Sequence, residues 1–169
     1  MMLIDSLKFS RDRQSARGTL PVAGFDRLRD SLFAVAPGAD GGGGISYEVR
    51  GSADARDHPL LGLKVSGRLA LQCQRCLKVL DHELMIDTAL RLVPEEALDA
   101  EMSDDPDKAD CIAASTELDL LALIEDEILL ALPAYPRHED AGCGASTDVA
   151  GTKKDSAFSV LSKLGTLKQ

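Results

Sequence analysis

The chain has 169 residues, of which 44% are hydrophobic and 4% aromatic, and its formal net charge is −9 at pH 7. This length and apolar content suit one domain with an aliphatic core and argue against disorder throughout the chain. No apolar run approaches the roughly 20 residues that a membrane-spanning helix needs, and residues 1–10 lack the apolar stretch of a signal peptide. We therefore expect a cytoplasmic protein that does not bind membranes.

The negative charge is concentrated in one segment. Residues 94–127 contain 13 acidic residues against one basic residue, Lys108, whereas the chain before and after them is close to neutral. An acidic segment attracts basic partners and repels phosphate backbones. A solvated acidic loop is the simpler interpretation of the same segment.

The first elements of the chain are short. Residues 5–9 are compatible with an edge strand, and residues 25–33 place three apolar side chains at helical spacing. Residues 37–44 contain Pro37 and a run of glycines, which predicts a flexible loop.

Three segments then alternate between apolar and polar side chains. They span residues 45–50, 61–72 and 80–92. Successive side chains of a strand point to opposite faces, so this pattern predicts one buried and one solvated face. We expect an antiparallel meander whose last two strands form a long hairpin. The acidic residues 94–114 should follow as a loop or a disordered excursion.

The strongest predicted helix spans residues 117–132. Thr116 and Asp119 resemble a capping box at its start, and Pro133 and Pro136 end it. Its apolar stripe consists of Leu121, Ile124 and Ile128, widened by Leu120, Leu123 and Leu130.

These elements predict an α+β fold, in which a small antiparallel sheet packs against one main amphipathic helix. We expect residues 1–144 to form a single domain with a flexible acidic insert at residues 94–114. Residues 145–169 are predicted to be a polar linker followed by a short amphipathic helix.

Three sequence motifs together resemble the YceD family of bacteria and plastids. They are LQCQRC at Leu71–Cys76, DLLALIEDEILLALP at Asp119–Pro133 and FSVLSKL at Phe158–Leu164. The resemblance runs from about residue 60 to the C-terminus. Members of this family support the accumulation of large-subunit ribosomal RNA, so the resemblance implies a role in ribosome biogenesis without an established reaction.

Cys73 and Cys76 form a CxxC motif between two predicted strands, which is the shape of a zinc knuckle. Zinc takes four ligands, and His138 and Cys143 are the best remaining candidates. Free thiols in a compact turn are the alternative. Thiol redox chemistry is a third interpretation, although a redox CxxC usually begins a helix.

Two groups of charged residues are candidates for binding a macromolecule. Arg68, Arg75 and Lys78 could contact RNA phosphates, although ordinary solvated residues explain them equally simply. The carboxylates of Glu125, Asp126 and Glu127 could face a basic partner. Helical spacing spreads these three carboxylates around the helix, which does not favour a catalytic pair.

We therefore expect a non-catalytic accessory factor that binds a ribosomal protein or pre-ribosomal RNA of the large subunit. The sequence contains no glycine-rich phosphate loop and no nucleophile-elbow motif, so no small-molecule substrate is evident. The first alternative is a carboxylate- and magnesium-dependent RNA-processing enzyme. The second is a CxxC thiol redox protein.

Overall fold

The computed structural model of the chain describes residues 2–33, 44–101, 110–139 and 143. The strands are β1 (Leu3–Ile4), β2 (Ser15–Leu20), β3 (Ile45–Ala53), β4 (Pro59–Gln72), β5 (Val79–Val93), β6 (Cys111–Ala113) and β7 (Leu118–Asp119). The α-helices are α1 (Ser6–Arg11), α2 (Leu98–Glu101) and α3 (Leu120–Ala131), and the 3-10 turns are η1 (Val22–Gly24), η2 (Leu28–Ser31) and η3 (Glu95–Ala97).

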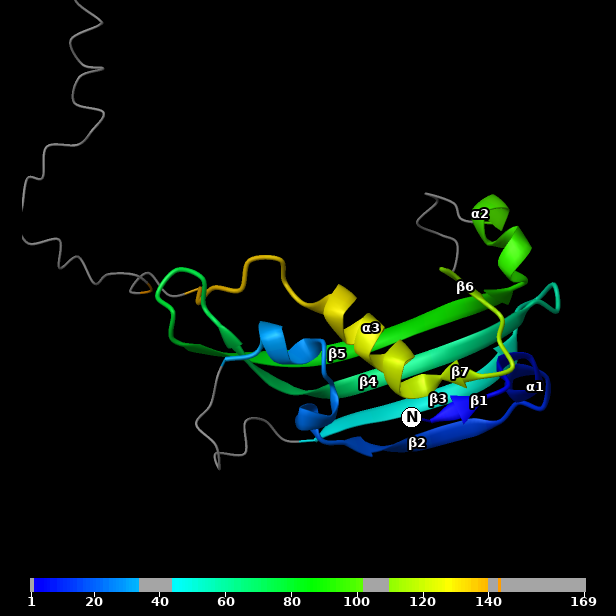
Figure 1. The fold of residues 1–169 in the computed structure, drawn as a ribbon, viewed down its shortest axis with the longest axis horizontal. Coiled ribbons are helices and arrows are strands. Elements are labelled where there is room, and N and C mark those ends of the chain that lie inside the picture. The colour runs from blue at the N-terminus through cyan, green and yellow to red at the C-terminus, as the bar shows by residue number, and fades with distance from the viewer. Residues whose placement is uncertain (1, 34–43, 102–109, 140–142, 144–169) are drawn as a thin grey trace, which may run out of the picture.

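The main sheet has five strands in the order β2-β3-β4-β5-β6 (Figure 1). The pairs from β2 to β5 are antiparallel, and the short β6 pairs with β5 in parallel. The pairing of β4 with β5 extends from Leu60 and Arg91 to Gln72 and Val79. These contacts confirm the predicted α+β fold, the meander and its long hairpin.

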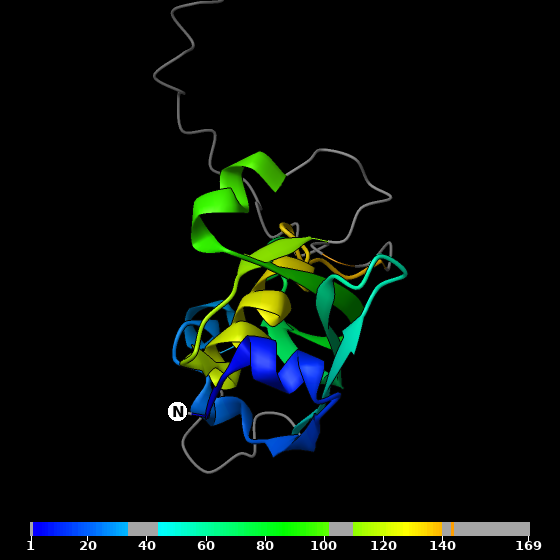
Figure 2. The same cartoon turned by 90° about the vertical axis from the view of Figure 1, so that its right-hand side faces the viewer.

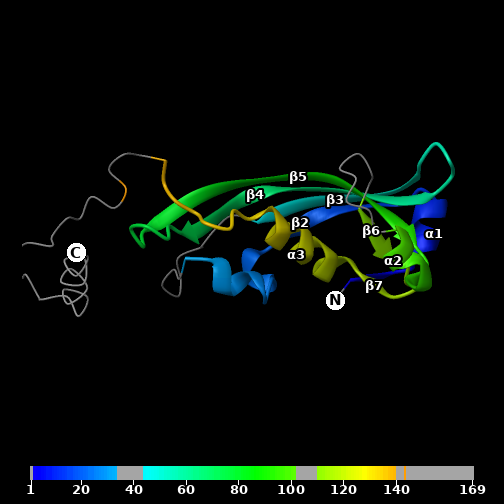
Figure 3. The same ribbon diagram turned by 90° about the horizontal axis from the view of Figure 1, so that it is seen from above.

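One face of the sheet is covered and the other is open. Figure 3 shows α3, the η1–η2 segment and the β1–β7 pair on the same side of the sheet, and Figure 2 shows the stack from its end. The covered face follows the predicted alternation along β3, β4 and β5. Its fully buried side chains are Ile45, Val49, Leu61, Leu63, Val65, Leu69, Leu71, Leu84 and Leu90. The aliphatic core therefore lies between the sheet and α3.

The N-terminal segment is a helix, so the prediction of a strand at residues 5–9 is wrong. Asp5 is the N-cap of α1, and its carboxylate accepts a hydrogen bond from the Lys8 backbone N–H at 2.9 Å. The helix lies close to β3 at Gly51, where an added Cβ would meet the Phe9 carbonyl oxygen at 2.2 Å. A side chain at this position would therefore push α1 away from the sheet.

The start of α3 also differs from the prediction. Leu118 and Asp119 are extended because they pair with Ile4 and Leu3 of β1, so the helix begins only after them. Asp119 is the N-cap, and its carboxylate accepts hydrogen bonds from the backbone N–H groups of Leu121 and Met2, both at 3.0 Å. The helix ends at Ala131, just before Pro133, as the sequence predicts.

The buried face of α3 is rotated relative to the predicted stripe. Ile124 and Ile128 are fully buried, as expected, together with Leu120 and Leu123. Leu121 is only partly buried, and Leu130 is 78% exposed, so Leu130 does not belong to the stripe.

The described parts of the acidic segment contain regular structure where the sequence predicts a loop. They contain η3 and α2 at residues 95–101 and β6 at residues 111–113, while residues 102–109 lie outside the described part of the chain. The first expected helix, at residues 25–33, is reduced to the 3-10 turn η2. Most of the predicted glycine loop and the C-terminal segment also lie outside the described residues. No helix in the described part of the chain is long and apolar enough to cross a membrane.

Candidate metal centre

The turn between β4 and β5 extends beyond the end of α3 (Figures 1 and 3). Cys73 closes the turn through its backbone, because its N–H donates to the Lys78 carbonyl at 2.9 Å and its carbonyl accepts from the Leu77 N–H at 2.8 Å. Leu77 has a φ of 60°, a left-handed conformation that costs roughly 1–2 kcal/mol outside glycine. The chain therefore adopts a strained, tight turn that brings Cys73 and Cys76 to one side.

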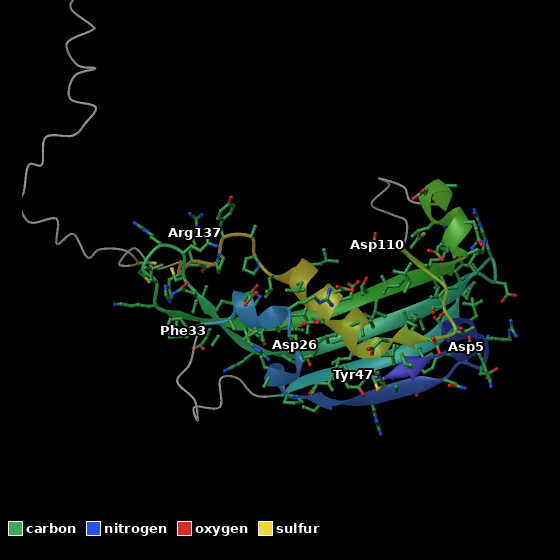
Figure 4. The ribbon with its side chains drawn as sticks, viewed as in Figure 1. Asp5, Asp26, Phe33, Tyr47, Asp110 and Arg137 are labelled. Carbon is green, nitrogen blue, oxygen red and sulfur yellow. The ribbon has the colours of Figure 1, made fainter. Side chains whose placement is uncertain are left out.

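The loop after α3 runs back to this turn. The Gln74 N–H donates to the Pro136 carbonyl at 2.9 Å, which joins the two segments through their backbones. We call the joined segments, residues 72–80 and 133–139 together with Cys143, the hairpin tip. Figure 4 shows Arg137 beside the turn and sulfur atoms at the same end of the molecule.

Four side chains predicted as metal ligands meet in the hairpin tip. The Cys73 and Cys143 Sγ atoms are 3.4 Å apart, and His138 Nδ1 lies 3.4 Å from Cys76 Sγ and 3.5 Å from Cys143 Sγ. One ligand atom of each residue lies within 4.8 Å of those of the others, so the group could hold a metal ion. Cys73 and Cys143 are buried, while Cys76 and His138 are partly buried.

A second contact orients the His138 ring. Its Nε2 lies 2.9 Å from the Val79 carbonyl oxygen, which can only accept, so Nε2 carries the proton. Nδ1 is then left with a lone pair that faces the thiols. Metal-binding histidines are commonly held in this way, with the second ring nitrogen donating to a carbonyl.

The surroundings of Cys73 favour the thiolate. Burial opposes ionisation of the Cys73 thiol, but the backbone N–H groups of Cys76, His138 and Arg75 and the Cys143 thiol stabilise its anion. Together they lower the pKa of Cys73 to about 5. Burial and the neighbouring thiol groups of Cys73 and Cys76 raise the pKa of Cys143. A thiolate is the form of cysteine that binds metals.

The donor set and spacing match a tetrahedral metal ion. With metal–sulfur bonds of about 2.3 Å, as for zinc, tetrahedral sulfur ligands lie about 3.8 Å apart. The contacts of 3.4–3.5 Å among these atoms are close to that spacing. The fourth cysteine, Cys111, lies in β6 beside Arg91 and takes no part in the cluster.

The predicted RNA-binding residues are not all in one place. Arg75 and Lys78 are exposed in the hairpin tip. Arg68 lies on the open face of β4, opposite Glu83 and five residues before Cys73, which is about 17 Å along a strand. The structure brings Arg137 into the tip instead. Its position beside the candidate ligand His138 was the signal in the sequence that could have identified it.

The three consecutive carboxylates of α3 have different surroundings. Glu125 is buried and accepts hydrogen bonds from the backbone N–H groups of Arg27 and Leu28 at 2.7 and 3.0 Å, and from Arg27 Nε at 3.0 Å. Arg27 also pairs with Asp126. The expectation that Glu125 faces a basic partner is therefore wrong, because its carboxylate anchors the η2 segment to the helix.

Asp126 and Glu127 remain nearer the surface. The Asp126 side chain is about half exposed in its pair with Arg27, and Glu127 is partly buried. Burial, followed by the nearby charges of Asp110 and Asp126, raises the pKa of Glu127. Asp126 and Glu127 therefore remain the two carboxylates of α3 that could face a basic partner.

A family model described as "Large ribosomal RNA subunit accumulation protein YceD" matches residues 61–165 of the chain. The matched region begins at the third residue of β4 and includes the rest of the β4–β5 hairpin, α3 and all four residues of the candidate metal centre. No solved structure matches the chain.

Proposed function

Because the chain belongs to the YceD family of large ribosomal RNA subunit accumulation proteins, we propose that it is a non-catalytic accessory factor in large-subunit biogenesis. It supports the accumulation or processing of large-subunit ribosomal RNA by binding a ribosomal protein or pre-ribosomal RNA. A structural zinc ion, held by Cys73, Cys76, His138 and Cys143, fixes the shape of its hairpin tip. Such a role places the protein in the cytoplasm.

The observation that carries the zinc assignment is the meeting of two distant parts of the chain at one point. Cys73 and Cys76 come from the turn between β4 and β5, and His138 and Cys143 come from the stretch that follows α3. Three sulfurs and one imidazole nitrogen form a soft donor set that suits zinc and not magnesium or calcium. All four positions are protein ligands, as in structural sites, so no position is left open for a substrate.

The two alternative functions find less support in the described residues. In the described part of the chain, the Cys73, Cys76, His138 and Cys143 cluster is the group of side chains that converges as metal ligands, and it contains no carboxylate. A magnesium enzyme needs converging carboxylates. A redox function needs an accessible thiolate, but Cys73, whose pKa is lowered, is buried.

The zinc assignment is tested by measuring the metal content of the untagged protein, purified without chelator. We expect about one zinc per chain, its loss in Cys73→Ser, and its retention in Cys111→Ser, which changes a cysteine outside the cluster. Wild-type protein without zinc, or equal zinc in both variants, would contradict the assignment.

The ribosomal role is tested separately in cells that lack the chain. We expect the ratio of large- to small-subunit ribosomal RNA to fall and to recover when the wild-type chain is supplied. An unchanged ratio in the depleted cells would overturn the role, whatever the metal content of the purified protein.

A further inference from the structure

The hairpin tip displays an aromatic side chain on a fixed loop. Tyr135 is 77% exposed and lies next to Pro136, whose carbonyl accepts the hydrogen bond from Gln74. His138, on the same loop, is held against Val79 and the thiols. The loop therefore presents the tyrosine ring to solvent from a position that is anchored at two points.

The two segments of the tip also carry three exposed cations. Arg75 and Lys78 lie in the turn and Arg137 in the loop, and none of the three side chains forms an ion pair with the described part of the chain. By contrast, Arg27 and Lys64 are engaged by carboxylates. The cations of the tip are therefore available to an external anion.

A hollow of about 390 Å³ lies between the turn and the loop. Apolar side chains from β4, the end of α3 and the loop form part of its wall, among them Leu71, Leu132 and Pro136. Its polar lining consists of the amide side chains of Gln72 and Gln74 together with Asp30 and Ser31 of η2. Apolar walls with a few hydrogen-bonding groups suit a flat ring that carries donors and acceptors on its edge.

The charges of the molecule are separated along its length. The tip carries its three cations and one exposed acidic residue, Glu139, at one end of the long hairpin, while acidic residues of η3 and α2, and Asp110 just before β6, lie at the other end (Figures 1 and 4). The 13 paired residues of each hairpin strand span about 40 Å. A polyanion that approaches this acidic protein is therefore directed to the tip.

From this arrangement, and resting on the proposed function, we propose that the hairpin tip binds single-stranded RNA. Arg75, Lys78 and Arg137 contact phosphates, Tyr135 stacks on one base, and the hollow with Gln72 and Gln74 receives a neighbouring base. Aromatic stacking requires unpaired bases, so a duplex of the same sequence binds more weakly.

The test measures fluorescence anisotropy of a labelled 12-nucleotide RNA without self-complementarity, titrated with the full, zinc-containing chain. Tyr135→Ala should weaken binding roughly tenfold, whereas Tyr135→Phe, which keeps the ring, should bind like wild type. Leu130→Ala is the matched control, because Leu130 is equally exposed but lies on α3. Each variant is first shown to keep its zinc.

The salt dependence of RNA affinity provides a second readout, because it reports phosphate contacts and a merely structural change would leave it unaltered. Three phosphate contacts on a single strand predict a slope of about −2 for log K against log salt, and Arg137→Gln should reduce it by about 0.7. Arg56→Gln, which changes an exposed arginine in the β3–β4 turn, should leave the slope unchanged.

Two results would overturn the RNA assignment. One is equal RNA affinity of wild type and Tyr135→Ala. The other is no RNA binding by the zinc-containing wild type; if Tyr135→Ala then also fails to restore large-subunit RNA in depleted cells, the tip binds a protein partner instead. If the wild-type chain restores the RNA without binding it, the proposed function stands and this inference fails.

Discussion

The middle and the tip of the β4–β5 hairpin are parts of one continuous pair of strands, but they are held by different forces. In the middle, Leu63, Leu69 and Leu84 are buried beneath α3 and the η1–η2 segment. Beyond the end of α3, no helix of the described part of the chain covers the sheet, and Leu77 and Val79 are exposed. There, backbone hydrogen bonds between two segments and the four side chains of the candidate metal centre provide the contacts.

The difference shows how one hairpin can carry a stable core and, at its end, a separate candidate metal centre. Burial of aliphatic side chains stabilises the middle without any ligand. Among the described residues, the tip has little apolar cover to hold it in that way, so we expect a metal ion to fix its shape. We therefore expect the two regions to respond independently to mutation and to metal removal.

The largest effect should come from placing a charge in the middle of the core. Ile124 has no exposed surface, so Ile124→Asp buries a carboxylate without a partner and should unfold the domain. Leu130→Asp is the matched control on the same helix, because Leu130 is 78% exposed and should tolerate the change. Circular dichroism melting curves compare the two. A cooperative, wild-type-like melt of Ile124→Asp would contradict the assignment of this face.

Metal removal should have the next largest effect and should be confined to the tip. With a strong chelator we expect the Tm to fall by roughly 5 °C or more, while the far-ultraviolet dichroism of the sheet and α3 persists. Hydrogen exchange should become faster at the backbone N–H groups of Cys73, Gln74 and Leu77, which close the tip. Equal acceleration in β3 would show that the two regions are not independent.

A smaller effect is expected where α3 anchors the η2 segment. Glu125→Ala leaves the buried Leu28 N–H without its acceptor and should lower the free energy of unfolding by about 1–3 kcal/mol. Asp126→Ala removes only an exposed ion pair to Arg27 and should cost less than about 1 kcal/mol. Urea unfolding of the two variants measures the difference. Equal losses would contradict the distinction drawn between these carboxylates.

The smallest expected effect is the pH dependence of the free energy of unfolding, which has opposite signs for Glu125 and Glu127. Burial opposes ionisation of Glu125, but the Leu28 N–H and Arg27 lower its pKa, so its carboxylate stabilises the fold above the ordinary glutamate pKa of about 4.3. That contribution is lost as the pH falls through the lowered value. The pKa of Glu127 is raised, so the neutral form stabilises at low pH and this contribution is lost as the pH rises.

Urea unfolding between pH 7 and pH 3 can distinguish the two opposite pH dependences. The destabilisation by Glu125→Gln should shrink on acidification, whereas Glu127→Gln should be neutral or stabilising at pH 7 and lose that advantage at low pH. Parallel pH profiles for the two variants would show that their environments do not differ as described.

The sequence predicted the elements whose formation depends on residues that are close together in the chain. The alternation of β3, β4 and β5 and the prolines after α3 were sufficient to predict a meander, a long hairpin and the end of the helix. β2 was missed because this edge strand is largely exposed and does not alternate cleanly, and β6 because it has only three residues. The beginning of α3 depends on the distant strand β1, which competes for Leu118 and Asp119.

In the candidate site, too, some features could be predicted from the sequence and others could not. The four candidate metal ligands could be proposed from the sequence because CxxC and the later His138 and Cys143 have the chemistry of zinc ligands, and the structure brings these residues together. The burial of Glu125 could not be predicted, since its partner Arg27 is 98 residues away in the chain. Likewise, the exposure of Tyr135 beside the turn depends on a backbone hydrogen bond between distant segments.

The candidate metal centre is best tested by X-ray absorption at the zinc edge, measured on the untagged protein. A zinc ion held by Cys73, Cys76, His138 and Cys143 should give a shell of three sulfurs at about 2.3 Å and one nitrogen at about 2.0–2.1 Å, with one sulfur lost in Cys143→Ser. A shell of nitrogen and oxygen atoms alone, or a spectrum that Cys143→Ser leaves unchanged, would place the metal elsewhere. The hairpin tip would then have to be held by its hydrogen bonds alone.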